Sequence, residues 1–174
     1  MRSKKGHLPL VGVGPVIVFG QIVMTAIAIQ LSYKNNWNYL QFGIFNIPLK
    51  IIGCILISFG LYLDYSAKKK SKLFQHIAEN KLITDGVYSI VRNPVYGGAL
   101  LMCAGAVCIT NKLFLFGVIV ICWIYMTILL INTEERWLRD LYGQEYIDYC
   151  RKVNRCIPWF SDNTSNKRKG RNSK

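Results

Sequence analysis

The chain has 174 residues, of which 52% are hydrophobic, and it carries a formal net charge of +13 although only 18% of its residues are charged. The apolar residues come in long blocks and do not alternate with polar ones, which argues against a soluble basic domain that binds nucleic acid. We therefore predict an all-α, polytopic membrane protein in which residues 1–160 form a single membrane-embedded domain.

Four apolar blocks follow one another along the chain, and each is a candidate transmembrane helix. A helix needs about 20 apolar residues to cross the hydrocarbon core of a bilayer. The candidate spans are 8–32, 44–65, 94–110 and 113–131. Only Thr110-Asn111-Lys112 separates the last two, which predicts a tight helical hairpin. Small residues such as Gly98 and Gly105 make the third span slim, so a neighbouring helix can approach it closely.

Basic residues lie almost entirely on one side of these spans. Nineteen of the 22 lysines and arginines fall in the N-terminal flank, in the loop after the second span and in the C-terminal segment, whereas Lys34 and Lys112 fall in the other two connections. The positive-inside rule then predicts that both termini are cytoplasmic. The tail, residues 161–174, is polar and basic and is predicted to be disordered.

Ionisable groups are scarce within the predicted spans. They hold no Asp, Glu or His at mid-membrane, where a proton-coupled transporter usually needs one. The six cysteines form no C-x-x-C pair and lie near no histidine at zinc spacing, so nothing predicts a disulfide framework or a metal site. Polar and aromatic residues gather instead at the cytoplasmic face, in two stretches that the hairpin brings together.

The first stretch runs from Lys81 to Gly98 and ends in VRNPVYGG. Asn is a favoured N-cap and Pro a favoured first helical residue, so one interpretation is that Asn93-Pro94 simply starts the third helix. The other is that the free N–H groups at this helix start, with Arg92 beside them, bind a carboxylate or a phosphate. The residues alone leave both interpretations open.

The second stretch contains Glu134-Glu135 at the predicted C-terminal end of the fourth helix, where the helix dipole disfavours carboxylates. Either these groups are interfacial charge, or one of them binds a ligand. Adjacent helical residues point about 100° apart, so we expect one carboxylate to accept hydrogen bonds from the ligand and the other to face water. The tyrosine-rich segment that follows predicts interfacial helices, broken near Gly143, that form a lid or a membrane anchor.

Together the two stretches resemble the isoprenylcysteine carboxyl methyltransferase and phospholipid N-methyltransferase superfamily of integral-membrane methyltransferases. The family pattern is G-x-Y, R-H-P-x-Y, a helical hairpin, E-E-x-x-L, F/Y-G-x-x-Y and a final I/L-P. The chain matches this order over residues 81–158, at Gly86-Val-Tyr88, Arg92-Asn93-Pro94-Val-Tyr96, Glu134-Glu135-Arg-Trp-Leu138, Tyr142-Gly143-Gln-Glu-Tyr146 and Ile157-Pro158. The order of the elements around the hairpin is more specific than any single element.

The resemblance implies that S-adenosyl-L-methionine is the methyl donor, bound at the cytoplasmic face, and that a lipophilic acceptor enters sideways from the lipid bilayer. The methionyl carboxylate would meet the helix start and Arg92, and tyrosine rings would pack on the adenine or face the sulfonium. The candidate catalytic residues are Arg92, Asn93 and Glu135. The implied donor-binding residues are Lys81, Leu82, Ile83, Tyr88, Asn93, Pro94, Val95, Tyr96 and Glu134.

Two positions depart from the family pattern. The family histidine is Asn93 here, which donates and accepts hydrogen bonds but does not act as a base. Members that methylate a prenylcysteine carboxylate carry an arginine about one turn before the Glu, where this chain has Leu130 and Ile131. We expect a prenylcysteine-like carboxylate as acceptor. The alternatives are a phospholipid or other lipid amine, and a non-catalytic membrane relative.

Overall fold

The computed structural model describes residues 12–35, 43, 45–70 and 81–156. The regular elements of this part of the chain are helical, and an isolated parallel bridge joins Val91 to Asn154 without a strand being formed there. The predicted all-α class is therefore confirmed for the described residues. The elements are α1 (Gly14–Lys34), α2 (Asn46–Tyr65), the π-helical turn η1 (Ser66–Lys70), the 3-10 helix η2 (Gly86–Ser89), α4 (Pro94–Thr110), the 3-10 helix η3 (Leu113–Leu115), α5 (Phe116–Asn132), α6 (Glu134–Tyr142) and α7 (Gln144–Lys152).

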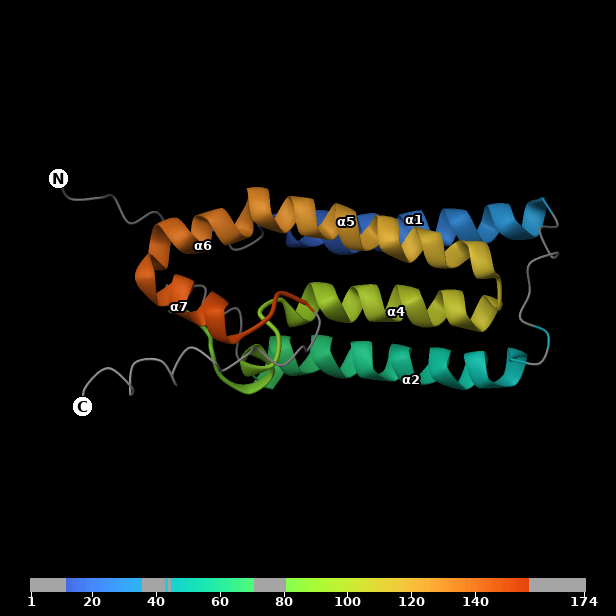
Figure 1. Cartoon of the computed structure of the whole chain (residues 1–174), viewed down its shortest axis with the longest axis horizontal. Coiled ribbons are helices and arrows are strands. Elements are labelled where there is room, and N and C mark those ends of the chain that lie inside the picture. Colours follow the sequence, from blue (N-terminus) through green and yellow to red (C-terminus); the bar gives the residue numbers. More distant parts are fainter. Residues whose placement is uncertain (1–11, 36–42, 44, 71–80, 157–174) are drawn as a thin grey trace, which may run out of the picture.

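The four long helices run side by side (Figure 1). α1 begins, α2 ends, α4 begins and α5 ends at the same end of the bundle, which we call the site end, and α6 and α7 lie there as well. α4 packs mainly against α2 and also contacts α1 and α5. Segments that are far apart in the sequence, at 81–98 and 130–156, therefore meet at the site end.

Three helical stretches are long and apolar enough to cross a membrane: Gly14–Lys34, Asn46–Lys69 and Leu113–Tyr142. Large apolar side chains on their outer faces are exposed, including Phe19 at 70% and Ile47 at 71%, as expected for a surface that meets lipid. The protein is an integral membrane protein. α4 is apolar but has only 17 residues, so the count of four spans stays a prediction, as do the single domain over 1–160 and the two cytoplasmic termini.

The predicted element bounds agree well with the observed ones. α2 covers 46–65 of the predicted 44–65, α4 coincides with the predicted 94–110, and η3 with α5 covers 113–131. α1 begins at Gly14, and residues 8–11 of the predicted first span lie outside the described residues, as does the predicted disordered tail.

Two pairs of glycines set the distance between α2 and α4. A Cβ atom built on Gly60 would lie 2.5 Å from the carbonyl oxygen of Gly98, and one built on Gly105 would lie 2.5 Å from the carbonyl oxygen of Gly53. Backbones can approach this closely only where neither helix carries a side chain. The close approach predicted for the third span is therefore made to α2. This contact fixes the start of α4 relative to the end of α2.

The hairpin between α4 and α5 is tight, as predicted. Asn111 ends α4 in the left-handed conformation, with φ of 56°. The next residue, Lys112, is buried, and its Nζ donates to the carbonyl oxygen of Ser32 at 3.0 Å and approaches Ser32 Oγ at 3.1 Å. The same ammonium lies 4.0 Å from the ring centroid of Tyr33. These contacts join the hairpin to the end of α1, far from the site end.

α6 and α7 are two nine-residue helices that meet at Gly143, where the sequence predicted a break. Gly143 has φ of 55° and ψ of −123°. Residues other than glycine rarely adopt this backbone conformation. α7 buries Tyr146 and Tyr149 against Val153 and Leu82. The short helices are therefore packed onto the site end, and a lid function for them stays a prediction.

Candidate functional site

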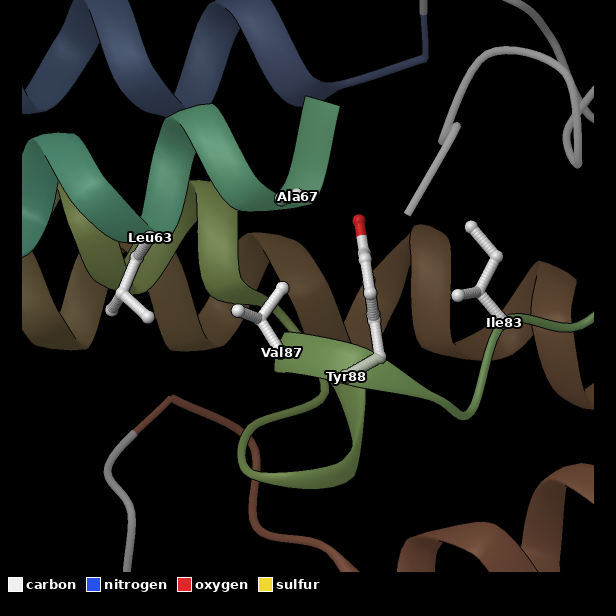
Figure 2. Close-up of a cluster of buried hydrophobic side chains, with 5 residues drawn as sticks. All are labelled: Leu63, Ala67, Ile83, Val87 and Tyr88. Carbon is white, nitrogen blue, oxygen red and sulfur yellow. The ribbon is translucent and has the colours of Figure 1, made fainter. Parts of the chain in front are cut away.

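An apolar cluster forms one wall of the site end. It joins the end of α2 and the turn after it to the segment that precedes α4 (Figure 2). Its buried members are Leu63, Ala67, Ile83, Val87 and Tyr88. The cluster holds the 81–89 segment against the helix pair α2 and α4, so two of the predicted donor-binding residues, Ile83 and Tyr88, are fixed by packing.

The start of α4 is only partly as the sequence predicted. Asn93 is the N-cap residue and Pro94 occupies the first turn, as expected, but the Asn93 side chain makes no capping hydrogen bond. Its Nδ2 instead donates to the carbonyl oxygen of Arg155 at 3.3 Å, and its backbone N–H donates to the same oxygen at 2.9 Å. Asn93-Pro94 does start α4, but the Asn93 side chain does not cap it. The side-chain amide donates instead to a backbone carbonyl of the C-terminal segment.

The two glutamates do not lie at the C-terminal end of the fourth helix, so the position predicted for them is wrong. α5 ends at Asn132, the backbone breaks at Thr133, and Glu134 and Glu135 form the first turn of α6. The Thr133 hydroxyl donates back to the carbonyl oxygen of Leu129. Carboxylates in a first turn are favoured by the helix dipole. The helix dipole therefore favours both carboxylates at these positions, and it gives no sign that either of them binds a ligand.

Glu134 faces the start of α4. Its Oε1 accepts a hydrogen bond of 2.5 Å from the hydroxyl of Tyr96, in the first turn of that helix. Tyr96 also packs beside Val13 and Leu100 at the edge of an apolar cluster that contains Met126 and Leu130. The pairing brings two predicted donor-binding residues together from opposite ends of the hairpin.

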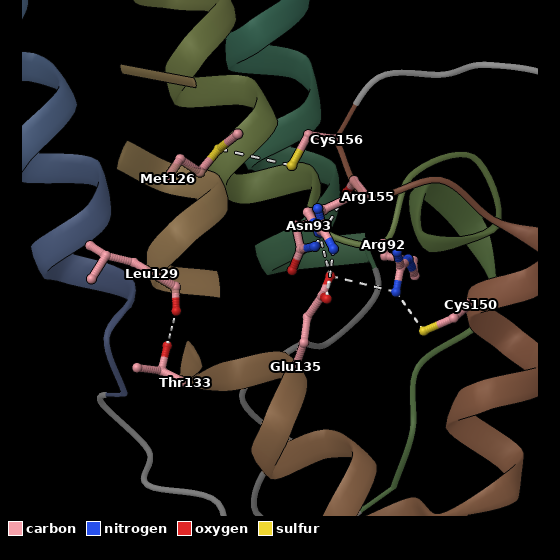
Figure 3. Close-up of polar contacts among 9 residues, drawn as sticks. All are labelled: Arg92, Asn93, Met126, Leu129, Thr133, Glu135, Cys150, Arg155 and Cys156. Atoms are coloured by element: carbon pink, nitrogen blue, oxygen red, sulfur yellow. Dashed lines mark hydrogen bonds and ion pairs between the residues drawn. The ribbon is translucent and has the colours of Figure 1, made fainter. Parts of the chain in front are cut away.

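Glu135 is buried, with 3% of its surface exposed, so it is not a carboxylate that faces water, whereas Glu134 is half-buried. Arg155 binds it in a bidentate manner, with Nε 2.6 Å from Oε1 and NH2 2.9 Å from Oε2 (Figure 3). Arg92 NH1 lies 3.5 Å from Oε1 and also donates to the Cys150 sulfur. Two guanidinium charges thus face a single carboxylate, and Nε of Arg92 is buried without a hydrogen-bond partner.

Two tyrosines join α7 to the segment before α4. The hydroxyl of Tyr149 donates to the carbonyl oxygen of Tyr88 at 2.6 Å. Burial raises the pKa of both tyrosines above the usual range, so each hydroxyl stays protonated at neutral pH. Tyr149 is consequently a hydrogen-bond donor that fixes the backbone of the predicted donor-binding segment.

The other predicted donor-binding residues differ in their placement. Leu82 packs toward the tyrosines of α7, whereas Val95 packs on the apolar cluster around Tyr88. Lys81 is exposed. The structure therefore brings Asn93, Tyr96 and the two glutamates to one place and leaves Lys81 at its margin.

Arg155 is the principal site residue that the sequence did not predict. It is 20 residues from Glu135 and belongs to no local motif, although it comes just before the Ile157-Pro158 match. Within the described residues, no group of three or more His, Cys, Asp or Glu side chains is arranged to hold a metal ion.

Comparison with known proteins identifies related chains. A model of the family described as phospholipid methyltransferase matches residues 49–145. Protein-S-isoprenylcysteine O-methyltransferase B of Arabidopsis thaliana is 28% identical over 127 residues, which is 72% of this chain and 62% of the relative. Protein-S-isoprenylcysteine O-methyltransferase of Xenopus laevis is 33% identical, over 64% of this chain and 41% of the relative.

A third relative has a different name. Methanethiol S-methyltransferase 1 of Bradyrhizobium diazoefficiens is 37% identical over 73 residues, which is 42% of this chain and 25% of the relative. The matches to these three relatives thus span between a quarter and about three-fifths of their lengths. No solved structure matches the chain.

Proposed function

Because the chain belongs to the phospholipid methyltransferase family, we propose that it is an integral-membrane methyltransferase that transfers a methyl group from S-adenosyl-L-methionine to a lipophilic acceptor. The observation that carries the proposal is the polar cluster at the site end. Within the matched segment, Tyr96 and Glu134 form a pair beside Glu135 and Arg92, where helices from both halves of the hairpin meet.

The charges of the cluster fit the two ends of such a donor. Arg92 and Arg155 share the Glu135 carboxylate, so the guanidinium of Arg92 is only partly paired next to the start of α4, and its buried Nε has a hydrogen to donate. A methionyl carboxylate would meet both needs. Glu134 would take a ribose hydroxyl or the ammonium group, and the rings of Tyr96 and Tyr88 offer π-faces to a sulfonium or an adenine.

Bound S-adenosylmethionine supplies a methyl group on an already activated leaving group. The residues of this chain then need to align the acceptor and exclude water, and they need not supply strong acid or base chemistry. This suits the site, because Asn93 is not a base and the oxygens of Glu135 are engaged by Arg155. Arg92 and Asn93 are assigned to orientation of the donor.

Among the described residues of the site end we find no dedicated base, which favours an acceptor that is already deprotonated at neutral pH. A carboxylate satisfies this condition, and a protonated amine does not. The names of the two isoprenylcysteine O-methyltransferase relatives support the same choice, so a prenylcysteine-like carboxylate is the proposed acceptor. One position favours a lipid amine instead: Leu130 is fully buried where carboxyl-methylating members carry an arginine, and it offers an acceptor no charge.

The site end is proposed to be cytoplasmic. The loop after α2 and the segment after α5 carry most of the 22 basic residues, and both emerge at the site end. A donor dissolved in the cytoplasm and an acceptor dissolved in the membrane would then meet at the start of α4.

Calorimetry with S-adenosylhomocysteine, the product of the donor, tests donor binding in detergent. We expect wild type to bind and Glu134→Ala to bind about tenfold or more weakly, because hydrogen bonds to a charged group contribute about 1.5–3 kcal/mol. The matched control is Glu145→Ala, which removes an exposed carboxylate from the first turn of α7 and should bind as wild type does. No binding to folded wild type would exclude the methyltransferase proposal.

A methyl-labelled donor then separates the acceptors. Wild type would be incubated with an N-acetylated prenylcysteine in mixed micelles and, separately, with phosphatidylethanolamine vesicles. Label in a base-labile ester of the prenylcysteine would support the carboxylate acceptor. Label in the phospholipid headgroup alone would show instead that the acceptor is a lipid amine.

A further inference from the structure

Residues 153–156, which we call the strap, lie along the start of α4. The backbone N–H of Arg92 donates to the carbonyl oxygen of Asn154 at 2.8 Å, and that of Asn93 donates to the carbonyl oxygen of Arg155 at 2.9 Å. The contact is close, because a Cβ atom built on Gly97 would lie 3.0 Å from the carbonyl oxygen of Cys156. The strap therefore contacts both the residues before α4 and its first turn.

The side chains of the strap anchor it to other elements. Arg155 holds Glu135 of α6 through two hydrogen bonds, and Cys156 Sγ lies 3.8 Å from Met126 Sδ of α5 (Figure 3). Val153 packs with the tyrosines of α7. Three separate helices thus hold the strap, and the pair of Glu135 with Arg155 is the charged link among these anchors.

The strap also decides how the amide of Asn93 is turned. A backbone carbonyl only accepts hydrogen bonds, so the group that faces Arg155 O must be the NH₂ of the amide. Oδ1 of Asn93 consequently points away from the strap. It presents a hydrogen-bond acceptor on the side of the residue that the strap leaves open.

We propose that Glu135 and Arg155 are positioning residues, whose ion pair clamps the strap on the start of α4 and so fixes Asn93 and Tyr96 for donor binding. The inference rests on the proposed function and gives Glu135 a role other than that of a proton acceptor. Both of its oxygens accept hydrogen bonds from Arg155, and one of them also faces Arg92.

The test compares Glu135→Gln, Arg155→Met and the double variant, with Arg151→Met as the matched control. Arg151 has the same type of side chain in the same region, but its ion pair with Asp148 is exposed. S-adenosylhomocysteine affinity and kcat are measured well below the unfolding temperature of each variant. We expect both single variants to bind S-adenosylhomocysteine about tenfold or more weakly than wild type, because small displacements of binding groups have large effects. The double variant should bind no more weakly than the weaker-binding single variant, because both substitutions break the same ion pair.

Other outcomes would overturn the inference. If Glu135 were a base, Glu135→Gln would lower kcat with unchanged affinity, and its effect would add to that of Arg155→Met. Equal affinity of wild type and Arg155→Met would mean that the strap does not position the site, whereas the proposed function would stand. Failure of wild type itself to bind would instead remove the proposed function.

A second measurement needs no ligand and applies to Arg155→Lys, which keeps the charge but loses the bidentate geometry. Cys156 is buried in the strap, and burial raises the pKa of its thiol to about 12, so it should resist alkylation in wild type. We expect Arg155→Lys to increase Cys156 alkylation several-fold in peptide-resolved mass spectrometry, while the Arg151→Lys control does not. Unchanged protection of Cys156 would contradict the clamp.

Discussion

The glycine contacts between α2 and α4 allow a quantitative prediction for Gly60→Ala. The new Cβ would lie 2.5 Å from the carbonyl oxygen of Gly98 and 2.8 Å from Met102 Cγ, whereas ordinary contacts begin at 3.4 Å. The Met102 side chain can rotate away, but the Gly98 carbonyl belongs to a helix backbone, so the two helices must separate. Overpacking of this kind costs about 1–3 kcal/mol, offset by about 0.5–1 kcal/mol from the better helix propensity of alanine.

We therefore expect Gly60→Ala to lower the free energy of unfolding by about 0.5–2 kcal/mol, measured by reversible unfolding in detergent. The matched control is Gly117→Ala in α5, where a Cβ would meet no atom within 4 Å, so propensity alone acts and the protein should be unchanged or slightly more stable. The separation would also move the start of α4, so Gly60→Ala should weaken S-adenosylhomocysteine binding as well. If Gly60→Ala proved as stable as Gly117→Ala, the close approach of the two helices would be refuted.

Three further substitutions test other parts of the structure by thermal unfolding. Gln21 is fully buried in α1 and both polar atoms of its amide lack hydrogen-bond partners, so Gln21→Leu should stabilise the fold by about 1–3 kcal/mol; a loss of stability would reveal a polar partner. Gly143→Ala should destabilise by about 1–3 kcal/mol because of its positive φ, and equal stability would argue against the sharp turn between α6 and α7. Tyr96→Phe leaves Glu134 without its donor and should cost about 1–3 kcal/mol, whereas Tyr125→Phe, whose hydroxyl bonds to Val16 near the lipid surface, should cost less.

The long helices could be predicted from the sequence because length and apolar content decide whether a segment spans a membrane. The hairpin was equally predictable, since Asn111 and Lys112 leave too few residues for any other connection. What the sequence did not reveal is which helix α4 packs against. Glycines on α4 indicate close approach to some neighbour, but only three-dimensional structure shows that Gly53 and Gly60 of α2 face them.

The site was predicted less completely for two physical reasons. First, no proline or glycine lies between α5 and α6, so no local sequence signal predicts the break at Thr133. This break is what places both glutamates in the first turn of α6. Second, Glu135 and Arg155 are brought together by the backbone pairing of the strap, and no periodicity connects two residues 20 positions apart. The motif order did place Glu134 near the start of α4, because antiparallel helices bring the two ends of a hairpin together, but the hydrogen bond between Tyr96 and Glu134 was not predicted.

The strap has a consequence for how the protein is made. Asn93 and the carbonyl of Arg155 that holds it are separated by 62 residues, a stretch that includes both arms of the hairpin. At about 5–20 residues per second, the ribosome needs about 3–12 s to complete this interval. Within this interval α4 is synthesised first and α5 second, and Glu135 precedes its guanidinium partner by 20 residues, or about 1–4 s. The polar cluster can therefore assemble only after the ribosome has synthesised both arms of the hairpin and the strap.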